Sequence, residues 1–98
     1  MRNLLLIFLT FPASAQAKPQ VFHAVVLYTK PGWDSKFNNL EQLGIERAAE
    51  KKAYAACVGS GAADCVILEG AQITRCHFMN NMDSSGCEAE AYARGTAN

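Results

Sequence analysis

Four cysteines constrain the fold of this chain more than any other feature. They are Cys57, Cys65, Cys76 and Cys87, and successive cysteines lie eight, eleven and eleven positions apart, with no C-x-x-C pair. Zinc sites and dithiol redox sites use more closely paired cysteines than these. An even number of scattered cysteines in a short chain predicts two disulfides that staple a small fold. We therefore expect all four to be structural, with no metal bound.

Residues 1–17 have the layout of a secretory signal peptide. A short basic start is followed by an apolar run, residues 4–11, and then by small residues at alternate positions. The run is too short to cross a bilayer, which takes about 20 residues. Cleavage is expected after Ala15 or Ala17; Ala17 is preferred because the mature chain then begins with the polar, extended Lys18-Pro19. The sequence predicts an exported protein, periplasmic or extracellular, without membrane insertion after cleavage.

Length and charge limit the remaining possibilities. Cleavage after Ala17 leaves 81 of the 98 residues, enough for one domain, which we place at 18–95 with a disordered tail at 96–98. The full chain has nine basic and nine acidic residues, and Arg2 leaves with the signal peptide, so the mature charge is about −1. Without a basic surplus, neither nucleic acid nor an anionic membrane surface is an expected partner.

The first half of the mature chain predicts a strand followed by a helix. Residues 21–28 are almost continuously apolar, which predicts a strand buried on both faces. A capping box at Asn38 with Glu41, or at Asn39 with Gln42, opens a helix that runs to about Cys57. Small residues four apart give this helix a smooth face that can lie close to a sheet, and Gly59 is expected to be the left-handed residue after its end. These small residues are Ala49, Ala53 and Cys57.

The second half predicts strands. Residues 65–69 and 72–78 are expected to form a hairpin that turns at Gly70-Ala71, followed by a loop at 80–86. Residues 87–93 are helical by composition but alternate strictly between small and polar side chains, so we take them as a strand. The fold class that follows is α+β: a three- to four-stranded antiparallel sheet with one Ala-rich helix and two disulfides.

The mature chain resembles a family of small exported bacterial proteins classed as a domain of unknown function. The matching features are Val25–Tyr28, Gly32-Trp33, the A-x3-A-x3-C helix ending in Cys57, Asp64-Cys65, and the C-x-A-x-A strand from Cys87. The resemblance implies an exported α+β domain and carries no activity.

The disulfide pairing is left open by the sequence, because four cysteines allow three connectivities. Pairing of near neighbours, Cys57 with Cys65 and Cys76 with Cys87, is our first expectation. It would tie the helix end to the next strand and close the 80–86 loop. The family resemblance keeps a second possibility open, a bridge from Cys57 or Cys65 to Cys87.

Few residues are candidates for a functional site. Tyr28, Trp33 and Phe37 flank the Pro31-Gly32 turn and are either an exposed aromatic binding patch or packing over the sheet edge and helix start. They are the best binding candidates in the chain.

Catalytic and cofactor sites are not indicated. His77 with Asp83 or Ser84 would make a dyad, but no nucleophile elbow surrounds either serine of the 80–86 segment, and His23 and His77 lie in expected strands. The 80–86 segment also lacks the spacing of a calcium loop. We therefore expect no enzyme, no cofactor and no metal.

Three functions remain as hypotheses. The first is a small exported binding or interaction module whose partner is another protein, in its sharpest form an inhibitor or immunity-type protein. The second is a secreted effector or toxin-like protein. The third is a small hydrolase that uses His77.

Overall fold

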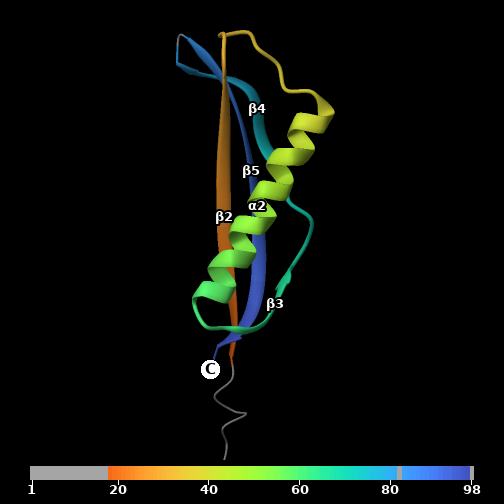
Figure 1. The fold of residues 1–98 in the computed structure, drawn as a ribbon, viewed down its shortest axis with the longest axis vertical. Helices are drawn as coiled ribbons and strands as arrows, with labels where there is room; N and C mark the ends of the chain where they lie inside the picture. The colour runs from red at the N-terminus through yellow and green to blue at the C-terminus, as the bar shows by residue number, and fades with distance from the viewer. Residues whose placement is uncertain (1–17, 82, 98) are drawn as a thin grey trace, which may run out of the picture.

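The computed structural model describes residues 18–81 and 83–97, and the expected signal peptide, residues 1–17, lies outside the described residues. The elements in chain order are β2 (Lys18–Pro31), α2 (Asn39–Gly59), β3 (Ala63–Ile67), β4 (Gln72–Asn81) and β5 (Ser84–Ala97). The helix lies obliquely across one side of the antiparallel sheet (Figure 1). The predicted α+β class with one helix and two disulfides is confirmed.

The sheet is organised around its last strand. β2 pairs with the whole length of β5, from Lys18 opposite Ala97 to Pro31 opposite Ser84. β3 and β4 both pair with the other edge of β5, one after the other and in the same direction. The expected hairpin between residues 65–69 and 72–78 is therefore wrong.

Two hydrogen bonds keep the chain from reversing where the hairpin turn was expected. The Leu68 N–H donates to the Tyr92 carbonyl at 2.9 Å, and the Ala71 N–H donates to Glu50 Oε2 at 3.1 Å. They anchor the segment between β3 and β4 to β5 at Leu68 and to α2 at Ala71. Gly70-Ala71 consequently interrupts one long strand instead of reversing it.

The turn that does occur is shorter than the loop expected at 80–86. β4 continues to Asn81 and β5 begins at Ser84, so these strands form a tight hairpin. Ser85 is fully buried, and its hydroxyl donates to the Gly32 carbonyl at 2.7 Å. Thr96 and Ala97, placed by the sequence in a disordered tail, pair with Pro19 and Lys18; residue 98 lies outside the described residues.

The helix begins as the capping box at Asn38 predicts. The Asn38 side chain accepts from the Glu41 N–H, and the Glu41 carboxylate accepts from the Asn38 N–H, both at 2.8 Å. The helix ends two residues beyond Cys57, and Gly61, with φ +88°, is the left-handed glycine after it. The expected left-handed role of Gly59 is wrong because Gly59 is still helical.

The core is made of small side chains from facing elements. The helix buries one stripe against the side of β5 that carries alternate alanines. Small residues on both surfaces allow the helix to approach the sheet closely, at the cost of little buried apolar area. The fully or nearly fully buried residues of this layer are Ile45, Ala49, Ala53, Cys57, Cys87, Ala89, Ala91 and Ala93.

The disulfides confirm the pairing of near neighbours. Cys57–Cys65 joins the last turn of α2 to β3, and Cys76–Cys87 joins directly opposed residues of β4 and β5. One bridge therefore holds the helix to the sheet, and the other holds two neighbouring strands together. Among the described residues, no helix is long and apolar enough to cross a membrane.

Candidate protein-binding surface

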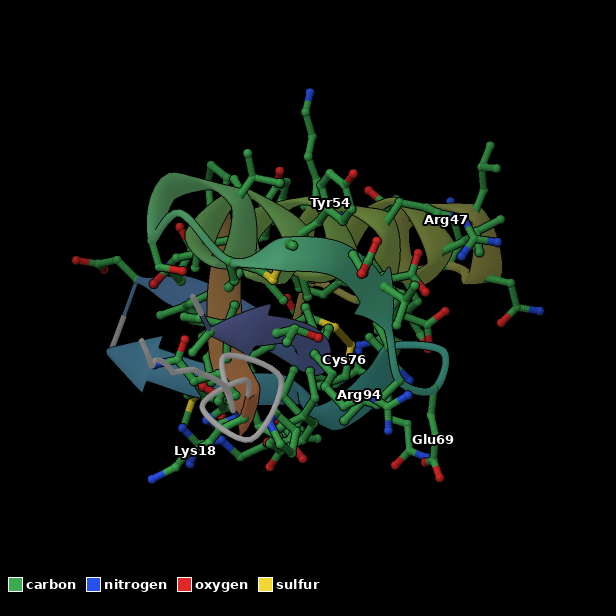
Figure 2. All side chains as sticks on the ribbon, turned by 90° about the horizontal axis from the view of Figure 1, so that it is seen from below. Lys18, Arg47, Tyr54, Glu69, Cys76 and Arg94 are labelled. Carbon is green, nitrogen blue, oxygen red and sulfur yellow. A yellow bond between two sulfur atoms is a disulfide. The ribbon has the colours of Figure 1, made fainter. Side chains whose placement is uncertain are left out.

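The side of the sheet away from α2 carries an exposed mixture of aliphatic, aromatic and charged side chains. Figure 2 shows the helix, with Tyr54 and Arg47, on one side and Glu69 and Arg94 on the other. We call this second side the open face. Its exposed apolar residues are Val21, Val25 and Leu27 on β2, Tyr92 on β5, and Val66 and Leu68 on β3 and just after it.

The open face corrects one expectation about β2. The apolar run at 21–28 predicted a strand buried on both faces, but Val21 is 58% exposed and Leu27 46% exposed. Phe22, Ala24 and Val26 alternate with them and pack under the helix. One helix covers one face only, so the second half of the apolar run lies on the surface.

A histidine, a glutamate and a tyrosine form an ordered cluster at the centre of the open face. His23 lies opposite Tyr92 in the β2–β5 register, and their rings stack with centroids 4.4 Å apart. His23 Nε2 lies 2.9 Å from Glu90 Oε1. The imidazole thus fixes the positions of both a phenol ring and a carboxylate on β5.

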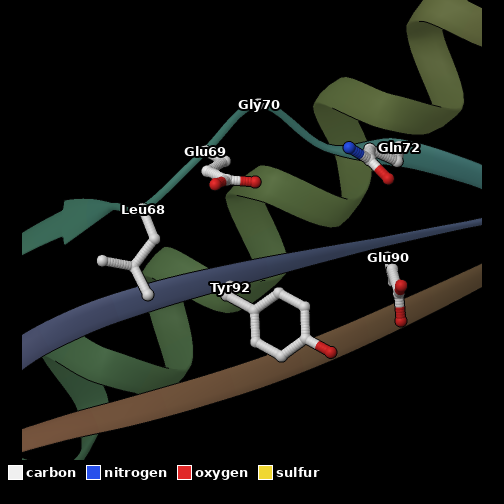
Figure 3. Close-up of a pocket in the computed structure, with 6 residues that line it drawn as sticks. All are labelled: Leu68, Glu69, Gly70, Gln72, Glu90 and Tyr92. Carbon is white, nitrogen blue, oxygen red and sulfur yellow. The ribbon is translucent and has the colours of Figure 1, made fainter.

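Next to this cluster lies a recess of about 300 Å³, where the edge of the sheet passes from β3 to β4. Its walls include the Tyr92 ring and Leu68, and the carboxylates of Glu69 and Glu90 (Figure 3). This volume is at the lower limit for small-molecule pockets and suits one long side chain of a partner. An apolar wall beside two carboxylates matches a lysine or arginine, whose stem is apolar and whose head is cationic.

The three predicted binding residues are only partly brought together. Phe37 is 5% exposed and belongs to the core, so it is not part of an exposed aromatic patch. Tyr28, 50% exposed, and Phe37 both line a second cavity of about 430 Å³ on the helix side of β2. Trp33 is 62% exposed in the turn after β2 and does not line that cavity.

Lys30 organises the surroundings of Phe37. Its Nζ lies 4.9 Å from the centroid of the Phe37 ring, donates to the Lys36 carbonyl at 2.6 Å and pairs with the Glu41 carboxylate at 2.9 Å. The hydrogen bond from Lys30, followed by that from the Asn38 N–H, lowers the pKa of Glu41 below its usual 4.5. These contacts make the start of α2 a structural junction, which accounts for the burial of Phe37.

Glu41→Gln is expected to make folding less dependent on pH in the acid range. The pKa of Glu41 is lower in the folded chain, so its stabilisation is complete above pH 4.5 and is lost as the pH falls through the folded value. Glutamine preserves a capping box but cannot pair with Lys30 as an anion. Denaturant unfolding from about pH 7 to about pH 3 should show the variant less stable at neutral pH, with the difference shrinking in acid. A difference that stays constant across this range would contradict the assignment.

His77 contacts the chain segment that precedes α2. Its Nδ1 accepts a hydrogen bond from the Phe37 N–H at 3.0 Å, and its φ of +65° coincides with an irregularity in the β4–β5 pairing. The ring lies 6.0 Å from that of Phe37. This arrangement holds the chain before α2 against β4 and supports a structural role for His77.

The open face was not identified as a site from the sequence, although one signal for it was present. The alternation in residues 87–93 already placed Glu88, Glu90 and Tyr92 on one face of a strand. The alternation does not show which strand pairs with residues 87–93, and this pairing is what brings His23 opposite Tyr92. The contribution of Leu68 and Gln72 depends on β3 and β4 lying in line, which local sequence does not reveal.

Comparisons of the chain with protein-family models, curated proteins and solved structures gave no match.

Proposed function

We propose that this protein is a small exported binding module whose partner is another protein, and that the partner contacts the open face. The observation that carries the proposal is the set of exposed apolar residues on β2, β5 and β3, and just after β3, that surrounds Tyr92. Protein interfaces favour such a centre of aromatic and aliphatic side chains with a polar rim. Here the rim is supplied by Glu88, Arg75 and Arg94.

The residues that line the recess indicate which side chain of the partner would occupy it. Because Glu69 and Glu90 lie beside Leu68 and Tyr92, we expect the partner to place a lysine or arginine there. The cluster of His23, Glu90 and Tyr92 is ordered before binding, which reduces the entropy lost on association.

The proposed place of action is the periplasm or the outside of the cell. Two disulfides fit an oxidising compartment, and residues 1–17 have the pattern of a signal peptide. A rigid, stapled domain with one prepared surface suits an inhibitor or immunity-type protein. This sharpest form of the proposal predicts that the partner is an enzyme or toxin whose activity falls on binding.

Capture from the cell envelope with matched variants tests the proposal. The full chain is expressed in its own cells with a C-terminal tag, as wild type, Tyr92→Glu and Tyr54→Glu. Tyr54 is similarly exposed, 47% against 41%, but it lies on the helix side of the molecule (Figure 2). We expect Tyr92→Glu to reduce recovery of the partner at least roughly tenfold and Tyr54→Glu to leave it unchanged.

The control for folding is the thermal transition of each exported variant. Equal recovery from wild type and Tyr92→Glu, with both folded, would show that the open face is not the binding surface. Loss of the partner only in Tyr54→Glu would move the surface to the helix side.

A further inference from the structure

We infer that two copies of this chain pair through the free edge of β2, with Val25 of each copy on a two-fold axis. Among the described residues β2 pairs only with β5, so one edge of a 14-residue strand is left without a neighbouring strand. Long unpaired edges attract further strands unless they are covered or interrupted. The inference concerns this edge and does not rest on the proposed use of the open face.

The backbone groups that point to the free edge belong to the odd-numbered residues of β2. The Leu68 N–H donates to the Tyr92 carbonyl, so Tyr92 directs its backbone groups away from β2. In an antiparallel pair the opposed residues either bond each other or both point outward, so His23, opposite Tyr92, points outward too. Two other bonds agree: the Lys52 ammonium donates to the Val25 carbonyl and the Ser35 hydroxyl to the Pro31 carbonyl.

Two prolines give this edge a centre. Pro19 and Pro31 are both odd-numbered and each lies six positions from Val25. Neither has an N–H to offer a second strand. The outward groups between the prolines belong to Val21, His23, Val25, Leu27 and Thr29.

When two copies pair about Val25, the outward N–H and C=O groups of all five residues form hydrogen bonds to the second copy. Val25 then bonds Val25 of the second copy, His23 bonds Leu27, and Val21 bonds Thr29, with Pro19 opposite Pro31 at both ends. Phe22 comes to lie opposite Tyr28, an aromatic cross-strand pair on the helix side. The exposed half of Tyr28, which the monomer leaves in solvent, gains a neighbour in this arrangement.

Neighbouring registers fit less well. Moving the axis to Ala24 places Pro19 opposite Thr29, and the Thr29 carbonyl then receives no hydrogen bond because proline has no N–H. The same shift brings Lys18 opposite Lys30. Moving it to Val26 places Pro31 opposite Val21, with the same loss of a donor. Like charges directly opposed on adjacent strands are destabilising. The register centred on Val25 avoids both faults and opposes Lys30 to Gln20.

The dimer would also continue the open face. An axis perpendicular to the sheet keeps both helices on one side and both sets of Val21, Val25 and Leu27 on the other. Lys52 is the one side chain among the described residues that donates to the central carbonyl of the edge, so it competes with the second copy. It must release Val25 before the strands can pair.

Sedimentation equilibrium of the exported protein, purified from cells that express the full chain, tests this inference. We expect a monomer–dimer equilibrium that Val25→Pro weakens roughly 30-fold, because two axial hydrogen bonds are lost. The change should leave the β2–β5 ladder intact, since the Val25 N–H points outward. Lys52→Ala should tighten the dimer about threefold, because the competing donor is removed.

Amide hydrogen exchange distinguishes this dimer from any other. The N–H groups of Val21, His23, Val25, Leu27 and Thr29 should become protected as concentration rises, while those of the even-numbered residues stay protected throughout. A protein that remains monomeric at millimolar concentration, or a dimer that Val25→Pro does not weaken, would overturn the inference. If the wild type is monomeric and captures another protein that Val25→Pro does not capture, the free edge of β2 binds that protein instead.

Discussion

Replacement of Cys57 and Cys65 together by alanine should lower the free energy of unfolding by about 2.5–4 kcal/mol. The closed loop is short, with a sequence separation of 8, and the loop-entropy relation gives about 2.6 kcal/mol for such a bridge. A further contribution comes from the sulfur atoms, because Cys57 is fully buried against the sheet. The loss is large for a domain of this size, whose total stability is expected near 5–10 kcal/mol.

Urea unfolding of the oxidised wild-type protein and of the double variant measures this difference. The expectation depends on the thin core: alanines on α2 and β5 bury little apolar area, so the bridge holds the helix end to β3. A loss below about 1 kcal/mol would show that packing alone fixes that end of the helix. Replacing both cysteines avoids the separate effect of leaving one free thiol.

Gly95→Ala should be strongly destabilising, at about 1–3 kcal/mol or more. A Cβ at Gly95 would lie 2.5 Å from Cys57 Sγ, 2.9 Å from Ala62 Cβ and 3.1 Å from Cys65 Sγ. A disulfide cannot move aside as a flexible side chain can. The strand would have to shift, and with it the pairing of β5 with β2 and β3.

Gly44→Ala is the matched control for this prediction. Gly44 lies within α2, and a Cβ there meets no atom within 4 Å. Alanine should therefore stabilise the helix by about 0.5–1 kcal/mol through lower backbone entropy in the unfolded chain. Thermal unfolding of the two variants should shift in opposite directions. A neutral Gly95→Ala would mean that the bridge is not seated against β5.

Local patterns in the sequence were sufficient to predict much of the fold. Capping-box patterns placed the start of the helix at Asn38 or Asn39, and the structure has it at Asn38. Strict alternation identified residues 87–93 as a strand despite their helical composition. The short separations between cysteines favoured the pairing that is found. Each of these features depends on residues close together in the chain.

The errors concern contacts between distant residues. Gly70-Ala71 has the composition of a turn, but the chain does not reverse there, because Leu68 is bonded to the Tyr92 carbonyl and Ala71 to the Glu50 carboxylate. The strand expected at 87–93 continues past Gly95 in β5, where the Cys57–Cys65 bridge occupies the space that a side chain would need. The sequence left Phe37 either in an exposed patch or packed over the helix start, because sequence does not show that Lys30 and His77 contact it.

The same limit applies to the candidate site. His23 and Tyr92 are far apart in the chain and meet only because β2 and β5 pair along their whole length. The recess requires β3 and β4 to share one edge of β5. The resemblance to an exported bacterial family implied neither feature, and membership of that family remains a prediction.

Photo-crosslinking in the cell envelope tests the binding role of the open face most directly. A photoreactive amino acid is placed at Leu68, in the wall of the recess, or at Leu40, on the first turn of α2 and 76% exposed. The proposal predicts that one partner protein is crosslinked from position 68 and not from position 40. Adducts from position 40 alone, or none from position 68 in a folded, exported chain, would contradict it.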